Sequence, residues 1–271
     1  MRKYIATLMT LLALFAVASV GAQAKIADGF YFAEEAAFPS SGWKYQVVLQ
    51  VKGGKIVSAT WNGINALGLE DKKTIASSGR NGMVKASKLG KEWHEQAAVV
   101  EKYLVDTQDL SFAKYTTPAG NTDAISGVSI HVKEFFDLAK AAVAAGPVAK
   151  GSYKKDGWFY AKAAAFDKSG YMTTVLITVV NGRVVSANWN ALNKAGGDTK
   201  FVRAAKGTYK MGAKQGEWNV QSPRVEAELI RIQDPAKIAV KADGHTDAIS
   251  GVSILVDEFV TLAAQALKAA K

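Results

Sequence analysis

The stretch Thr122–Ile130, with the sequence TDAISGVSI, recurs letter for letter at Thr246–Ile254. Other segments repeat around it: a pattern of Asp, Gly, three aromatic residues and Ala begins at Asp28 and again 128 residues later at Asp156. Farther along, Glu92-Trp93 returns as Glu217-Trp218 with an offset of 125, which small loop deletions explain. Two copies are too few for a solenoid, so the sequence predicts two tandem globular domains.

Both copies show strands followed by a terminal helix. Residues 45–51 and 173–180 are rich in β-branched and apolar residues, and a two-residue turn, Gly53-Gly54 or Asn181-Gly182, joins each to a second strand at 55–61 or 183–189. These segments predict β-hairpins. After the repeated stretch, apolar residues fall on one helical face in both copies: Val132, Phe135, Phe136, Ala139, Ala142 and Val143, then Val256, Phe259, Val260, Ala263, Ala264 and Leu267. The expected class is α+β, a small antiparallel sheet with a C-terminal helix in each copy.

The N-terminal residues have the pattern of a secretory signal peptide. Arg2 and Lys3 precede an uncharged stretch from Tyr4 to Val20, and Ala22-Gln23-Ala24 forms a small-residue cleavage pattern. A membrane anchor is the alternative, but the apolar stretch is short for a bilayer span. We expect cleavage after Ala24 and a periplasmic or secreted product. A boundary near Gly146-Pro147, where a helical pattern ends, then gives domains at 25–146 and 147–271.

Composition excludes several classes of function. The chain has no cysteine, so it has no disulfide, thiolate metal site or lipid-attachment Cys. Without residues 1–24 its net charge is +8, from 32 Lys and Arg against 24 Asp and Glu. This charge favours acidic partners or an anionic membrane surface, or serves solubility alone. Export argues against a nucleic-acid partner. The three histidines predict no metal site, and no motif of a hydrolase or nucleotide-dependent enzyme is present.

The repeated stretch combines residues with several chemical uses. Ser129 or Ser253 would lie at or near a helix N-terminus, where free N–H groups favour a negative charge such as an esterified phosphate. The glycine permits positive φ, and Asp123 or Asp247 suits an Asx-type turn. The alternative is purely structural, because Ser, Asp and Gly are ordinary capping and turn residues. Capping alone leaves the unchanged Ala, Ile and Val unexplained.

The two copies resemble the FMN-binding domain family, whose flavinylation motif is Asp-x-x-Ser/Thr-Gly-Ala-Thr before a short helix. The resemblance covers both copies, from the Asp-Gly-aromatic opening through Gly54–Ala59 to the terminal helix. In that family an FAD:protein FMN transferase esterifies the FMN phosphate onto the last hydroxyl of the motif. Here valine replaces the usual alanine and serine the usual threonine. The resemblance implies up to two covalent FMN groups, on Ser129 and Ser253, and these recognition residues: Asp123, Ser126, Gly127, Asp247, Ser250 and Gly251.

Two tryptophans at matching strand ends, Trp61 and Trp189, are candidates for contact with the flavin ring, with core packing as the alternative. Asn62 and Asn190 follow them as candidates for a hydrogen bond to the flavin edge or as turn residues.

The leading hypothesis is an extracytoplasmic electron-transfer flavoprotein that accepts electrons from a membrane redox complex. An electron carrier is favoured over an enzyme that converts a substrate, because no further catalytic domain accompanies the repeats. The alternative is a non-redox envelope module that binds partners or serves structure, keeping the fold without flavin. Valine beside the acceptor favours this alternative.

Overall fold

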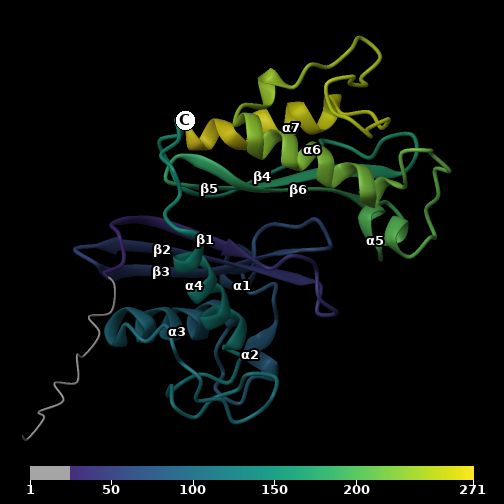
Figure 1. Ribbon diagram of the computed structural model, residues 1–271. Helices are drawn as coiled ribbons and strands as arrows, with labels where there is room; N and C mark the ends of the chain where they lie inside the picture. Colours follow the sequence, from purple (N-terminus) through teal and green to yellow (C-terminus); the bar gives the residue numbers. More distant parts are fainter. Residues whose placement is uncertain (1–24) are drawn as a thin grey trace, which may run out of the picture.

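The computed structural model describes residues 25–271 and shows the same arrangement twice (Figure 1). The signal peptide expected at 1–24 lies outside the described residues. The first repeat contains β1 (Gly29–Glu34), β2 (Trp43–Lys52), β3 (Lys55–Asn65), α1 (Lys72–Ser77), α2 (Met83–Ala86), α3 (Trp93–Thr107) and α4 (Lys133–Ala145). The second contains β4 (Gly157–Lys162), β5 (Tyr171–Val180), β6 (Arg183–Asn193), α5 (Lys200–Ala205), α6 (Trp218–Ile232), the 3₁₀ turn η1 (Pro235–Lys237), α7 (Asp257–Leu267) and the 3₁₀ turn η2 (Lys268–Ala270). The α+β class is confirmed.

Each sheet has three antiparallel strands in the order of the chain, β1-β2-β3 and β4-β5-β6. The predicted hairpins are the central and last strands, and both residues of each turn have positive φ. The repeated Asp-Gly opening is explained here. The Asp28 carboxylate accepts the N–H groups of Gly53 and Gly54 at 2.9 and 3.0 Å, and these bonds lower its pKa. Asp156 accepts from Asn181 and Gly182 in the same way, so each first strand is tied to the hairpin turn beside it.

The helices cover one face of each sheet. The α4 helix packs on β1 and β2, and α7 packs on β4 and β5, with the expected apolar face toward the sheet. The long helices α3 and α6 pack on the edge strands β3 and β6 and were not predicted. A capping box fixes the start of α3. The Glu92 side chain accepts the backbone N–H of Glu95, and the Glu95 side chain accepts the backbone N–H of Glu92.

Side chains from α3 cover the open edge of β3. Glu101 accepts the N–H of Trp61 at 2.6 Å, and the Gln108 amide bonds both backbone groups of Ile56, at 2.8 and 2.9 Å. Gln108 ends the helix at φ +59. Glu226 and Gln233 do the same for β6. The repeated glutamines therefore protect an edge strand whose free N–H groups would otherwise pair with another chain.

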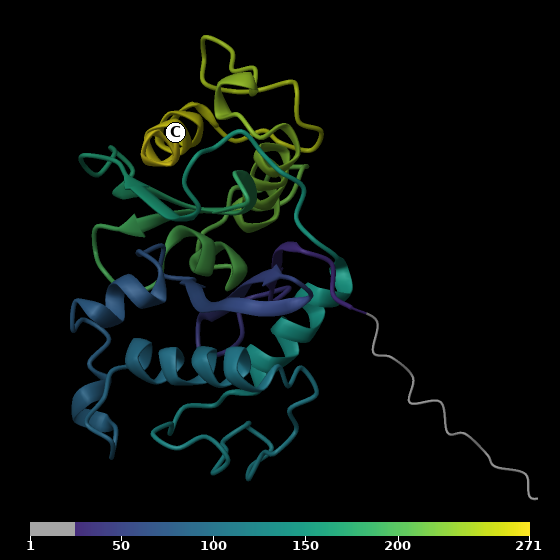
Figure 2. The same ribbon diagram turned by 90° about the vertical axis from the view of Figure 1, so that its left-hand side faces the viewer.

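The two sheets face each other with the helices on the outside, giving four layers (Figures 1 and 2). Buried polar groups join the sheets. The Gln46 side-chain oxygen accepts from Trp158 Nε1 at 2.6 Å and Thr178 Oγ1 at 3.0 Å. The Ala66 carbonyl accepts from Asn190 Nδ2 and Thr199 Oγ1, each at 2.8 Å. The repeats therefore form one body around a polar interface, whose satisfied hydrogen bonds fix their relative orientation.

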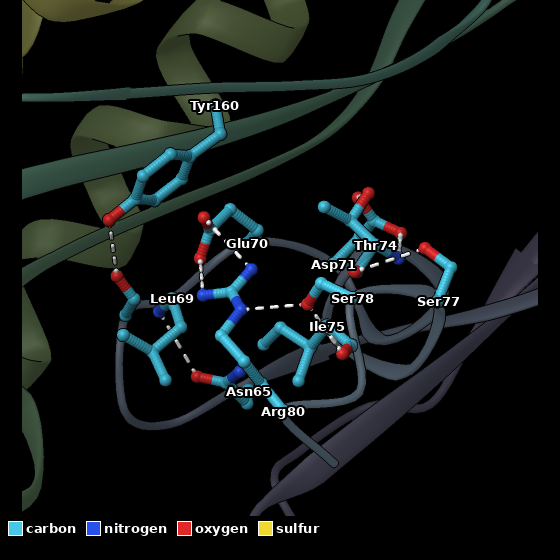
Figure 3. A network of polar contacts seen from close by, with 11 residues as sticks. Asn65, Leu69, Glu70, Asp71, Thr74, Ile75, Ser77, Ser78, Arg80 and Tyr160 are labelled. Atoms are coloured by element: carbon cyan, nitrogen blue, oxygen red, sulfur yellow. Dashed lines mark hydrogen bonds and ion pairs between the residues drawn. The ribbon is translucent and has the colours of Figure 1, made fainter. Parts of the chain in front are cut away.

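The loop between β3 and α1 also contacts the second repeat, and Figure 3 shows its polar network. Arg80 makes a two-point contact with Glu70, at 3.1 and 3.2 Å. The Tyr160 hydroxyl of the second repeat donates to the Gly68 carbonyl at 3.1 Å. Gly68 has φ +64, and a Cβ there would lie 2.7 Å from Thr174 Oγ1, so glycine allows this close approach.

Among residues 25–271, no helix has both the length and the apolar character that a membrane crossing requires.

Candidate functional site

The repeated stretch forms a loop between the long helix and the terminal helix of each repeat. The acceptor candidates, Ser129 and Ser253, are exposed in this loop. A fully buried glutamine holds each of them. Gln96 Oε1 accepts from the backbone N–H of Ser129 at 2.7 Å and from its hydroxyl at 3.1 Å, and Gln221 Oε1 accepts from Ser253 at 2.7 and 3.3 Å. The hydroxyl proton points to the glutamine, which leaves the oxygen lone pairs toward solvent.

The serines, expected at or near a helix N-terminus, lie near one but not at it. The α4 helix begins at Lys133 with Val132 as its N-cap, and α7 begins at Asp257 with Val256 as its N-cap. Each serine therefore lies three residues before the N-cap, outside the first turn, where the helix dipole has largely fallen off. The buried glutamine, not the helix, positions each serine.

The expected Asx turn is also corrected. The Thr122 hydroxyl donates to the Lys114 carbonyl at 2.6 Å and accepts the Ala124 N–H at 3.1 Å. Thr246 makes the same two bonds, to Ala239 and from Ala248. Threonine therefore fixes the turn. Asp123 and Asp247 are exposed, and Asp247 forms only a surface ion pair with Lys241 at 3.2 Å. Neither carboxylate is used by the turn, and both residues are exposed to solvent.

The remaining motif residues divide into surface and buried groups. Ser126 and Ser250 are exposed, and Gly127 and Gly251 have φ of +80 and +74, which favour glycine. The Arg224 guanidinium donates to the Gly251 carbonyl. By contrast, Val252 is buried and Val128 packs against the core, together with the motif isoleucines. This packing explains why the isoleucines and the valine of the motif are unchanged, but it does not explain the exposed Ala124 and Ala248.

The second repeat contains a cavity of about 840 Å³ beside its candidate serine, Ser253. Its wall includes Ser253, Trp189, Trp218, Lys200, Thr173 and Glu258. The volume lies within the range of about 300–1,000 Å³ typical of small-molecule sites. Of the residues proposed for the second repeat, Ser253 and Trp189 line this cavity, while Asp247, Ser250 and Gly251 do not.

The two candidate tryptophans differ in position. Trp61 is fully buried and packs against Trp93 and Phe135, with ring centroids 5.0 and 5.5 Å apart. Trp189 is 4% exposed and lines the cavity, packed on Trp218 and Phe259. Both indole N–H groups are buried and lack a hydrogen-bond partner among residues 25–271. Trp61 therefore belongs to the core, and Trp189 also forms the wall of a site.

The asparagines after the tryptophans are structural. Asn62 accepts the N–H groups of Gly63 and Lys73 and donates to Asp71 at 2.8 Å. Asn190 accepts from Ala191 and Phe201 and donates to Ala66. Each amide joins a strand end to the following short helix, so neither is available to a ligand edge.

Sequence reasoning missed a lysine at the same position of each repeat. Lys72 is 5% exposed, and its ammonium lies 4.1 Å from the ring centroid of Trp43 and 5.0 Å from that of Trp93. Lys200 lies 5.1 Å from Tyr171 and Tyr209 and 5.6 Å from Trp218, at the cavity wall. Burial lowers the pKa of Lys72 to about 8 and also lowers that of Lys200. The sequence could have identified this pair through the 128-residue offset, which relates Lys72 to Lys200. The Lys-rich surroundings alone do not distinguish these two lysines.

Lys72 is expected to make stability depend on pH. Because its pKa falls from 10.5 unfolded to about 8 folded, the unfolded chain binds more protons between these values. Stability therefore rises from pH 8 to 10.5, by up to about 3 kcal/mol. We expect Lys72→Met to remove this rise and to stabilise the protein at pH 7.

Urea denaturation at several pH values measures the difference between Lys72→Met and the wild type, in which other titrating groups cancel. Lys102→Met, at an exposed residue of α3, is the control and should behave as the wild type. A difference between Lys72→Met and the wild type that stays constant from pH 7 to 10.5 would contradict the assignment.

The second-repeat site fits a ligand with a planar ring and polar edges. The cavity has Trp189 and Trp218 in its wall, together with the ammonium group of Lys200 and the exposed hydroxyl of Ser253 at its border. Aromatic side chains suit ring contacts, and a cation suits carbonyl or anionic edges. These are the properties that FMN attached to Ser253 would require.

No family model and no curated protein matches the sequence. Similar solved structures include the solution NMR structure of a protein from Clostridium thermocellum, 52% identical, covering 43% of this chain and 92% of that chain with a TM-score of 0.36. The crystal structure of the CPE2226 protein from Clostridium perfringens is 26% identical and covers 43% of this chain and 88% of that chain, with a TM-score of 0.34. TM-scores this low do not establish a shared fold, and neither description names an activity.

Proposed function

We propose that this chain is an extracytoplasmic electron-transfer protein that carries FMN through phosphoester bonds to Ser129 and Ser253. The observation that carries the proposal is the placement of the repeated motif. In each repeat the last serine of the motif is exposed and is held from inside by a buried glutamine, and in the second repeat that serine borders the cavity.

The attachment step balances as a phosphoryl transfer. An FAD:protein FMN transferase would join the serine Oγ to the FMN phosphorus while the pyrophosphate bond of FAD breaks. AMP leaves and the hydroxyl loses its proton, with no change in oxidation state. The exposed Asp123 and Asp247 suit recognition by that enzyme, because neither carboxylate is used by the turn. The inward packing of Val128 and Val252 supports access to the acceptor, since the bulk beside it lies in the core.

The flavin would supply the electron-transfer chemistry, and the protein supplies its position and electrostatics. In the second repeat Trp189 and Trp218 offer ring contacts, while Lys200 places a positive charge in the cavity. A covalent bond keeps the cofactor near its site in a compartment where free flavin would diffuse away. The expected partners are the transferase and a membrane redox complex that donates electrons, and the net charge of +8 after cleavage favours an acidic partner or an anionic membrane surface.

The test is coexpression of the full chain with a competent transferase. We expect a yellow protein whose colour stays with the polypeptide after denaturation, is bleached by dithionite and returns in air. The non-redox envelope module predicts a colourless protein under the same conditions. Colour that is released on denaturation would show bound flavin without the proposed phosphoester bond.

A further inference from the structure

The two candidate sites can be compared position by position, because the repeat offset pairs their residues. Trp93 corresponds to Trp218, Lys72 to Lys200, and Glu134 to Glu258. One position differs strongly in size: Tyr45 of β2 corresponds to Thr173 of β5. Both side chains lie on the helix-facing side of their sheet, in step with the buried Val47 and Val175.

In the second repeat the small side chain leaves space. Thr173 lines the cavity together with Trp218 and Lys200. Its hydroxyl donates to Glu258 at 2.5 Å, which holds the threonine against α7. Lys200 is half-buried at the cavity wall, with its ammonium over Tyr171 and Tyr209.

In the first repeat the larger side chain is packed among the aromatic residues. The Tyr45 ring stacks on Trp93 with centroids 5.8 Å apart and planes 18° apart, and it contacts Trp61 at 5.3 Å. The Lys72 ammonium lies 5.3 Å from the same ring, and Lys72 is only 5% exposed. Tyr45 therefore occupies the stacking position on Trp93 that an aromatic ligand could take on Trp218.

We propose that Tyr45 and Thr173 make the two sites unequal: the second repeat takes a flavin ring into its cavity, whereas Tyr45 fills the equivalent position in the first. A flavin carried by Ser129 then keeps its ring outside the core, in contact with solvent. This inference rests on the proposed function for the identity of the ligand. The two flavins would thus differ in environment. The flavin of the second repeat would lie in a cavity lined by aromatic residues, and the flavin on Ser129 would be accessible to a redox partner.

The experiment titrates free FMN into the full chain expressed without transferase and follows quenching of flavin fluorescence. We expect one site per chain in the wild type. Thr173→Tyr should weaken binding at least tenfold, and Tyr45→Thr should create a second site. Thr173→Val is the matched control: it removes the bond to Glu258 but keeps the space, so its affinity should stay within about threefold of wild type.

Circular dichroism of each variant confirms that it is folded before binding is compared. The inference is overturned by two sites or none in the wild type, by unchanged affinity in folded Thr173→Tyr, or by a Tyr45→Thr variant that still binds one FMN. Covalent attachment is read separately by mass. If the substitutions change FMN binding as expected but no covalent FMN is found, the inference stands and the phosphoester is rejected. If two covalent FMN groups are found but the substitutions leave FMN binding unchanged, the phosphoester stands and the inference is rejected.

Discussion

Trp61→Ala is expected to lower the free energy of unfolding by about 3–5 kcal/mol, the usual cost of deleting a large aromatic side chain from a core. Trp61 is fully buried and contacts Tyr45, Trp93 and Phe135, so its removal leaves a cavity that three elements border. Urea denaturation followed by circular dichroism measures the loss. Because the indole N–H makes no hydrogen bond among the described residues, the cost is one of packing.

Trp61→Phe provides the graded control, since it keeps an aromatic ring and should lose clearly less stability than Trp61→Ala. Equal losses in the two variants would show that the indole edge, rather than the filled volume, stabilises the first repeat. A loss below about 1 kcal/mol for Trp61→Ala would contradict the placement of Trp61 in a close-packed core.

Gln221→Met is expected to reduce FMN attachment at Ser253 at least tenfold while attachment at Ser129 is unchanged. The methionine keeps the side-chain volume but removes the acceptor of the Ser253 N–H and hydroxyl and the donor to the Gly216 carbonyl, at 2.7 Å. The Ser253 N–H and the Gly216 carbonyl then lose their partners, and the loop is free to leave its position.

The two repeats control each other in this measurement. Gln96→Met should reverse the pattern, with loss at Ser129 and normal attachment at Ser253, because Gln96 holds Ser129 in the same way. Peptide mapping of coexpressed protein reads both serines in one sample. Equal attachment at both serines in each variant would show that the buried glutamines do not position the acceptors.

The hairpins and terminal helices could be predicted because their signals are local. The Asn181-Gly182 turn and the spacing of apolar residues such as Phe135 and Ala139 depend only on neighbouring residues. The α6 helix was missed because Pro223, which usually ends a helix, lies inside its first turns. Pro223 is the sixth residue of α6, beyond the first turn, so the Asn219 carbonyl lacks its usual partner within the helix.

The site was predictable in part. The repeat identified Ser129 and Ser253, but not the glutamines that hold them, because the contact joins residues 33 and 32 positions apart in the sequence. The roles of Lys72 and Lys200 likewise depend on tertiary packing. The distance from each serine to the helix could not be predicted, because sequence periodicity does not show that the helix starts four residues after the serine.

Intact mass with peptide mapping of the full chain, coexpressed with the FMN transferase, tests the central claim most directly. The account predicts a covalently added FMN on the peptide that contains Ser129 and another on the peptide that contains Ser253. Ser129→Ala and Ser253→Ala should each remove one, whereas Ser152→Ala, at an exposed serine outside the motif, should remove neither. An unmodified chain, or FMN on peptides that lack these serines, would contradict the account.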